Sequence, residues 1–212
     1  AIAATKRQII EGWFAKVAEQ VVVDWSDRPE SKRNNHDYWA AWSVMITSIV
    51  LNRQDLFDWA NKGLREGIAQ IDPDGFLPNE LKRSTRALNY HNYAIQPLVM
   101  LSAFSEANHV ELTNLERQAM IKLVTLTTES LSNPAPFEQK TGAQQITEGL
   151  ITSYSLAWME PYVQYFPNNT LFSSYLETLR PMKTTRLGGD LTQIFDTNVP
   201  VFAAPPKFTE IK

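Results

Sequence analysis

Apolar side chains recur at steps of three and four residues through most of this chain, and the strict alternation typical of half-buried strands is nearly absent. The pattern is clearest near the start, where it involves Ile9, Ile10, Trp13, Phe14, Val17 and Val21. Residues spaced in this way share one face of an amphipathic helix. The sequence therefore predicts an all-α fold of antiparallel helix pairs, with a first helix over residues 5–25.

The same spacing predicts further helices along the chain. Their ranges are residues 37–51, 55–71, 89 or 93 to 107, 113–130, 148–165 and 171–179. Loops are predicted at 72–75 and at 133–142, where proline and glycine are typical of turns. Residues 76–88 have no clear assignment, because Pro78 interrupts the pattern.

The tail after Pro181 is predicted to be irregular. It contains a Gly-Gly pair at 188–189 and prolines at 200, 205 and 206. Tryptophans at helical spacing are more often packed in a core than exposed for sugar stacking. Trp39, Trp42 and Trp158 are therefore interpreted as core residues.

The composition limits what the chain can bind. Its 212 residues, 43% of them hydrophobic, suffice for one domain or one large piece of a domain. The net charge of −3 argues against nucleic-acid and anionic-membrane partners. The chain has no cysteine, and its three histidines form no His-x-x-x-His pair, so no metal site is expected. No apolar run reaches membrane-spanning length, and the first residues lack the pattern of a secretion signal.

Two short segments concentrate the polar chemistry of the chain. The first is Asn-Asn-His-Asp-Tyr-Trp at 34–39. The second, at 79–93, reads Asn-Glu-Leu-Lys-Arg-Ser-Thr-Arg-Ala-Leu-Asn-Tyr-His-Asn-Tyr. An amide and a guanidinium can neutralise a carboxylate while an imidazole or phenolate removes a proton from the adjacent carbon, and a phenol can protonate the departing oxygen. These residue types therefore suit proton abstraction beside a carboxylate.

Both segments resemble the motifs of the alginate lyases of the poly(β-D-mannuronate) type, polysaccharide lyase family five. In that family an Asn-Asn-His element precedes a Lys-Arg…Tyr-His-Asn-Tyr element, and the resemblance covers the chain from about residue 24 onward. It implies that residues 1–212 form an alginate-lyase-like helical domain, an incomplete (α/α) toroid whose inner helices line a cleft for a sugar chain. It also implies a periplasmic or secreted protein whose partner is an anionic polysaccharide.

The position of the first motif bears on how much of such an enzyme is present. In the family it lies near the middle of the protein, and here it begins at Asn34. We therefore expect this chain to be the carboxy-terminal part, lacking early helices and a lid loop. A severed amino-terminal segment would then be a further partner.

The resemblance also assigns roles to individual residues. It gives substrate contacts to Asn35 and His36, neutralisation of the uronate carboxylate to Arg83, and the catalytic acid and base to Tyr90. Arg186, before Leu-Gly-Gly-Asp, matches a shorter pattern for binding a second carboxylate. Lys82 and Arg86 flank Arg83 and would form a basic groove with it.

The residues taken alone leave alternatives open. His36 could be a base or a structural residue, while Asn34 is the better candidate for the helix cap and Asn35 for a carboxylate ligand. The Lys82, Arg83 and Arg86 cluster could equally be a solvated helix face, and Arg186 a plain tail residue. A tyrosine such as Tyr90 is usually packing, but the nearby Arg83 and His91 would favour its phenolate by lowering its pKa.

The predicted function is a polysaccharide lyase that cleaves mannuronate-rich alginate, or a related β-1,4-uronate polymer, by β-elimination without metal or cofactor. One alternative is a glycoside hydrolase on a similar toroid, which would need two carboxylates from among Asp72, Asp74 and Glu80. Another is a non-catalytic polyuronate-binding helical module. That alternative would leave the set of Asn35, His36, Arg83 and Tyr90 as a coincidence.

Overall fold

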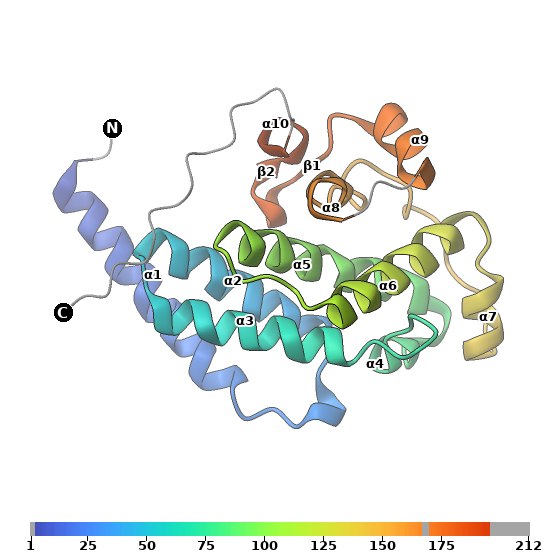
Figure 1. The fold of residues 1–212 in the computed structure, drawn as a ribbon, viewed down its shortest axis with the longest axis horizontal. Coiled ribbons are helices and arrows are strands. Elements are labelled where there is room, and N and C mark those ends of the chain that lie inside the picture. The colour runs from blue at the N-terminus through green and yellow to red at the C-terminus, as the bar shows by residue number, and fades with distance from the viewer. Residues whose placement is uncertain (1–2, 167–169, 196–212) are drawn as a thin grey trace.

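The computed structural model describes residues 3–166 and 170–195, and nearly all of its regular structure is helical (Figure 1). The long helices are α1 (Ala4–Trp25), α2 (Asn35–Leu51), α3 (Gln54–Ala69), α5 (Ala87–Ala107) and α6 (Asn114–Ser132). The shorter ones are α4 (Pro78–Leu81), α7 (Ala135–Thr141), α8 (Met159–Tyr165), α9 (Thr170–Leu179) and α10 (Leu191–Phe195). The predicted all-α class is confirmed.

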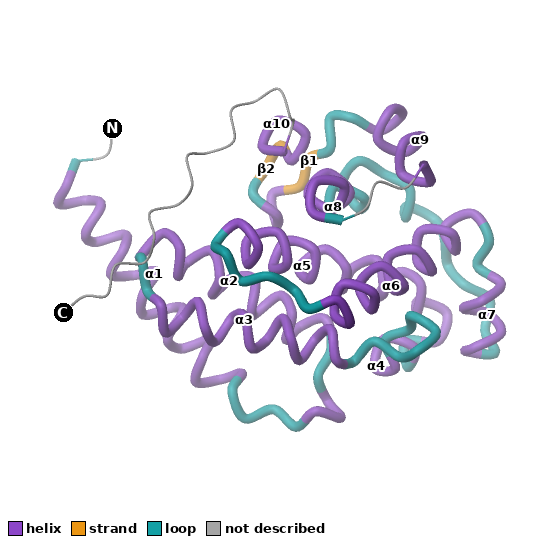
Figure 2. The backbone as a smooth tube through the Cα atoms, in the orientation of Figure 1, coloured by secondary structure: helices purple, strands orange, loops and turns teal. Residues whose placement is uncertain are grey.

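The centre of the fold is the packing of α2, α3 and α5, as Figure 2 shows. Asn52 takes a left-handed conformation that ends α2, so that α3 folds back along α2 as an antiparallel partner. Gly67 of α3 permits close approach, because a Cβ there would lie 2.8 Å from Leu98 and 3.0 Å from the Tyr38 ring. The result is a closely packed support for the amino-terminal end of α2 and the start of α5.

Residues 76–88, which the sequence leaves unassigned, form α4 and the turn that leads into α5. Pro78 lies in the first turn of α4, where proline lacks no required donor. A single 3₁₀ turn over Ser84–Arg86 then leads into α5, with Ser84 in the left-handed region at φ 53°. Gln145 holds this turn, because its side chain donates to the Ser84 carbonyl at 3.0 Å and accepts from the Leu88 N–H at 3.0 Å.

Two predictions between α6 and α9 are wrong. Residues 133–142 are not a loop throughout, because Pro134 precedes a short helix, α7, that buries Phe137. The helix predicted over 148–165 begins only at Met159. Before it, Gly149 has φ 74°, and the Ser155 hydroxyl bonds to the Leu150 carbonyl at 2.6 Å in place of a helical ladder.

The tail after Pro181 is more regular than predicted. Strands β1 (Lys183–Thr184) and β2 (Gly189–Asp190) pair in an antiparallel two-stranded sheet around a 3₁₀ turn at Thr185–Leu187. An ion pair between Lys183 and Asp190, at 2.8 Å, supports this pairing. Prolines 200, 205 and 206 lie outside the described residues.

Helix α1 carries its apolar stripe on the outside of the described structure. Ile9 is 69% exposed and Trp13 is 60% exposed, while Val21 packs partly against the core. An apolar groove of about 450 Å³ lies between α1, α2 and the turn that contains Arg186. In residues 3–166 and 170–195, no helix is long and apolar enough to cross a membrane.

The three tryptophans interpreted as core residues differ in burial. Trp158 is completely buried, and its indole N–H donates to Asn92 at 2.9 Å. Trp42 is also buried, whereas Trp39 is only half-buried and packs against the ring of Tyr93 with centroids 5.1 Å apart. Trp39 therefore lies at the edge of the core.

Candidate active site

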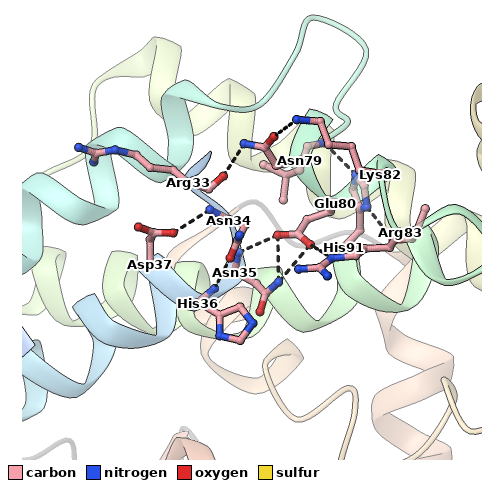
Figure 3. Close-up of polar contacts among 12 residues, drawn as sticks. Arg33, Asn34, Asn35, His36, Asp37, Asn79, Glu80, Lys82, Arg83 and His91 are labelled. Atoms are coloured by element: carbon pink, nitrogen blue, oxygen red, sulfur yellow. Dashed lines mark hydrogen bonds and ion pairs between the residues drawn. The ribbon is translucent and has the colours of Figure 1, made fainter. Parts of the chain in front are cut away.

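The amino-terminal end of α2 positions the first motif. The Asn34 side chain accepts the His36 N–H at 3.0 Å, and the Asp37 carboxylate accepts the Asn34 N–H at 2.9 Å. This reciprocal arrangement is a capping box, so the prediction that Asn34 caps the helix is confirmed. Asn35 and His36 consequently occupy the first turn, with their side chains toward different surroundings (Figure 3).

Asn35 points inward onto Glu80 of α4. Its backbone N–H donates to Oε1 of Glu80 at 2.6 Å, and its Nδ2 lies 3.0 Å from each carboxylate oxygen. Both residues are completely buried, and in the part of the chain described here the Asn35 Oδ1 has no hydrogen-bond partner. Burial raises the pKa of the Glu80 carboxyl, while the Asn35 hydrogen bonds and the charges of Arg83 and His36 act to lower it.

The structure brings Arg83 and Tyr90 together across the turn that begins α5. The Arg83 guanidinium lies over the Tyr90 ring, 4.6 Å from its centroid. Its Nε is 3.8 Å from the Glu80 carboxylate, which is an ion pair but too long for a hydrogen bond. Both side chains are partly exposed, so neither is closed off from a ligand.

His36 is exposed at the start of α2, where its ring stacks on Trp25 with centroids 6.5 Å apart. His91, in contrast, is a structural residue. It is completely buried, accepts the Leu77 N–H on Nε2 at 2.8 Å and donates from Nδ1 to the Ala87 carbonyl at 2.8 Å. Burial lowers the His91 pKa to about 4, so the expectation that its charge favours the Tyr90 phenolate is wrong.

Arg186 reaches the same helix from the tail of the chain. Its guanidinium donates to the Tyr93 hydroxyl at 2.9 Å, and its backbone carbonyl accepts the Trp42 indole N–H at 3.3 Å. Tyr93 follows Tyr90 by one helical turn. Burial raises the Tyr93 pKa, Arg186 lowers it, and the neighbouring Tyr90 phenol raises it further, which places all three groups within one electrostatic environment.

The remaining basic residues lie at the rim. Lys82 is exposed, and its ammonium donates to the Asn79 side chain at 2.6 Å. Asn79 in turn donates to the Arg33 carbonyl at 2.6 Å, which joins this rim to the loop before α2. Arg86 is exposed, and its guanidinium makes no hydrogen bond or ion pair with any residue that the structure describes.

The sequence reasoning missed two site residues, Glu80 and Tyr93. Glu80 was considered only as one of three carboxylates for a hydrolase, although its place three residues before Arg83 was a signal of contact. The other two have local roles, since Asp72 accepts the Phe76 N–H at 2.8 Å and Asp74 pairs with Lys140 at 3.0 Å. No group of three His, Asp or Glu residues that could hold a metal occurs in the described ranges.

Known proteins show the family of this chain. A family model described as Alginate lyase matches residues 1–137. The chain belongs to the alginate lyase family. An alginate lyase of Pseudomonas fluorescens is 47% identical to it over 189 residues, which are 89% of this chain and 51% of that protein. An alginate lyase of Cobetia marina is 46% identical, over 89% of this chain and 50% of its own length.

This alginate lyase family member thus spans about half the length of the curated relatives that it matches. Alginate lyase A1-III from Sphingomonas species A1 has the same fold, with a TM-score of 0.77 over 90% of this chain and 54% of that one. A variant of that lyase complexed with a tetrasaccharide gives a TM-score of 0.76. At 20% identity these matches concern the fold, and they confirm the predicted incomplete (α/α) toroid.

Proposed function

We propose that this chain supplies the catalytic residues of a polysaccharide lyase that cleaves mannuronate-rich alginate by β-elimination. The observation that carries this proposal is the stacking of Arg83 on Tyr90, 4.6 Å from guanidinium to ring centroid. A carboxylate-binding cation thereby lies beside a group that can exchange a proton. Membership in the alginate lyase family supports the choice of substrate.

In the proposed reaction, the Arg83 guanidinium binds the carboxylate on C5 of the uronate. Neutralising this carboxylate acidifies the C5 proton, because negative charge spreads onto the carboxylate in the transition state. The Tyr90 phenolate takes the C5 proton, the C4–O bond breaks, and a C4=C5 double bond forms. The departing oxygen then receives the proton from Tyr90, so that proton and electron balance is kept.

The same residue can serve as base and acid because of the sugar's stereochemistry. In mannuronate the C5 proton and the C4 oxygen lie on the same face, so one phenol reaches both. In the epimeric guluronate the proton lies on the opposite face, where His36 is our candidate for the base. His36 is exposed at the start of α2, which leaves it accessible to a sugar chain.

The remaining site residues would bind the polymer around the reacting bond. We assign Arg186 to a second uronate carboxylate, with Lys82 and Arg86 as further cations along the basic groove. Asn35 is completely buried on Glu80, so we propose that it acts at the base of the carboxylate site.

Product analysis on defined polymers tests the proposal. Elimination leaves an unsaturated uronate that absorbs in the near ultraviolet, whereas hydrolysis leaves a saturated sugar and a new reducing end. Polymannuronate, polyguluronate and polyglucuronate should be compared with the intact protein, and we expect the fastest rise in absorbance with polymannuronate. New reducing ends without this absorbance would establish a hydrolase instead, and binding without cleavage would establish a binding module.

We further propose that the exposed stripe of α1, formed by Ile9, Trp13 and Val17, packs against polypeptide corresponding to the half of the relatives that this chain does not span. Contiguous apolar surface of this kind usually marks an interface. Residues 1–212 expressed alone should then self-associate and show little activity, and adding the missing half should reverse both effects in light scattering and in the absorbance assay. A monomeric, fully active 212-residue chain would contradict this proposal.

Because alginate is an extracellular polymer, we also propose a periplasmic or secreted location.

A further inference from the structure

A completely buried carboxylate lies beneath the proposed site without a role in the reaction described above. Within residues 3–166 and 170–195, every hydrogen bond to the Glu80 carboxylate comes from Asn35, through its backbone N–H and its amide. The nearest cation is Arg83, whose Nε lies 3.8 Å away. Figure 3 shows the Glu80 carboxylate between these two neighbours.

The fold gives little reason for a carboxylate at this position. Burying a charge costs free energy unless a close partner compensates it, and a well-packed neutral side chain is often at least as stable. The start of α2 already has a complete capping box from Asn34 and Asp37. Glu80 is therefore not required to end the helix, although it adds one acceptor for the first turn.

The contacts of Glu80 do fix the direction of two polar groups. Its negative charge requires the Nδ2 end of Asn35 to face it. The Oδ1 end is therefore turned away and is buried without a partner among the residues that the structure describes. The position of Glu80 beside Nε holds one edge of the Arg83 guanidinium, while the Tyr90 ring covers one face. The Nη atoms of Arg83 make no hydrogen bond with the residues that the structure describes, so they are available to an anion.

We propose that Glu80 is a positioning residue for the elimination: it orients Asn35 and Arg83 so that the Nη edge of Arg83 receives the uronate carboxylate. This inference rests on the proposed function, because only a carboxylate substrate requires that arrangement. Glu80 does not touch the sugar and takes no part in proton transfer. Its effect passes through the two residues that it holds.

The substitution Glu80→Gln tests this role with little change in volume. A glutamine can still accept the Asn35 backbone N–H, but its NH₂ group then faces the Asn35 NH₂ group. The Asn35 amide must then turn over, which pairs its Oδ1 with the glutamine NH₂ group and moves its own NH₂ group to the side where Oδ1 has no partner among the described residues. The fold should survive, because the side-chain volume and the acceptor for the Asn35 backbone N–H are kept. Arg83 then loses the negative charge of Glu80, and the Asn35 amide is held in the opposite orientation.

In the intact enzyme, Glu80→Gln should lower kcat on polymannuronate by about 10- to 100-fold, the cost expected of misplaced substrate-binding groups. KM should change less than about threefold, because charge on the carboxylate grows in the transition state. The melting temperature should stay close to that of the wild type. Glu160→Gln is the matched control, since Glu160 is 1% exposed and lies on α8 among other partners. This control should lower the melting temperature while kcat of the folded protein is retained.

A double-mutant cycle separates positioning from general support. If Glu80 acts through Asn35 and Arg83, adding Glu80→Gln to an Asn35→Ala variant should cost less than it costs the wild type. Should Glu80→Gln fail to fold, Glu80→Asp keeps the charge but withdraws it by one methylene from Asn35, and kcat should again fall.

Three results would overturn the inference: wild-type turnover by either folded variant, a loss of kcat that follows the melting temperature and disappears on cooling, or full additivity in the cycle. A wild-type enzyme that makes no unsaturated product would instead refute the proposed function. These outcomes are distinguishable because the wild-type assay comes first.

Discussion

Among the residues that the structure describes, two glutamates, Glu80 and Glu160, are almost completely buried, and their surroundings differ in kind. Glu160, on α8, accepts two hydrogen bonds from Arg180 at 2.8 and 2.7 Å and one from the Thr192 hydroxyl at 2.6 Å. Glu80, on α4, accepts hydrogen bonds from the neutral Asn35 and has its cation 3.8 Å away. One charge is closely paired, and the other is not.

This difference distinguishes a charge with structural contacts from the charge that we propose to have a positioning role. The Glu160 group joins α8 to the end of α9 and to α10, and its bidentate geometry gives a cation the best position for compensating a buried carboxylate. Around Glu80, two groups make no hydrogen bond with any described residue, namely the Nη atoms of Arg83 and the Oδ1 atom of Asn35. Incomplete pairing of a buried charge is thus the feature that points to function.

The largest effect should come from Tyr90, with Tyr162 in the other region as the comparison. Tyr90→Phe should lower the elimination rate by about 10²- to 10⁴-fold, because it removes the proton-transferring hydroxyl and keeps the ring under Arg83. Tyr162→Phe, in the α8 region, should leave kcat unchanged, since Tyr162 packs among Trp158, Phe166 and Phe172. Absorbance assays on both variants, with circular dichroism to establish folding, make the comparison. Near-normal turnover by folded Tyr90→Phe would remove Tyr90 from the mechanism.

Removing the arginine beside each buried glutamate should affect stability in one case and activity in the other. Arg180→Ala leaves Glu160 buried without its close partner and should reduce the free energy of unfolding by about 3 kcal/mol. Arg83→Ala breaks only a 3.8 Å contact and should reduce it by about 1 kcal/mol, but the rate should fall by about 10²- to 10³-fold. Urea denaturation and initial rates measure the two quantities. Equal losses of stability would show that the two charges are compensated alike.

Low pH should reduce the free energy of unfolding, because His91 is buried in its neutral form. Its pKa is about 4 in the folded protein because burial disfavours the cation, and about 6.5 when the chain is unfolded. The unfolded state therefore binds the extra proton as pH falls from 6.5 toward 4, and stability is lost in that window. Between pH 7 and pH 5 the expected loss is about 2 kcal/mol. The midpoints of urea denaturation at the two pH values should show this loss of stability. The His91→Gln variant carries a side chain that is neutral at both pH values, so it should be less stable at pH 7 but should lose less stability at pH 5.

The smallest effect concerns the rim. Arg86 is exposed, so its attraction to a polyanion is screened by salt, with a screening length of about 8 Å at 0.15 M ionic strength. Arg86→Gln should weaken oligouronate binding by about two- to fivefold at low salt and less at high salt. Isothermal titration at two salt concentrations measures this, with Lys183→Gln as a control at a cation paired outside the site. Affinity that does not change with salt would contradict the basic groove.

Much of the fold could be predicted, because helical periodicity is a local property of the chain. The segments that were predicted wrongly are those where other interactions overrode the apolar spacing. Residues 148–158 have apolar spacing, yet the hydroxyls of Thr152 and Ser155 bond to each other and to nearby backbone. In the tail, Lys183 pairs with Asp190 across a short hairpin, a pairing that composition does not reveal.

The sequence motifs predict which residues form the candidate site, but they do not predict how those residues interact in the interior. The spacing of Arg83 and Tyr90 allowed contact only if the backbone between them turned correctly, and that depends on Ser84 in the left-handed region and on Gln145 from a distant segment. The neutral state of His91 depends on complete burial, which a sequence window cannot give. Glu80 was overlooked because its partner Asn35 lies on a different helix.

The two hydrogen bonds of Arg186 have a consequence for the order in which the protein is made. They reach back 93 residues to Tyr93 and 144 residues to Trp42. A ribosome adds about 5–20 residues per second, so a growing chain presents Asn35, Arg83 and Tyr90 several seconds before Arg186 emerges. During that interval the hydroxyl of Tyr93 and the indole of Trp42 lack their final partners. Maturation of this face therefore waits for the segment around Arg186 and is not set by local folding alone.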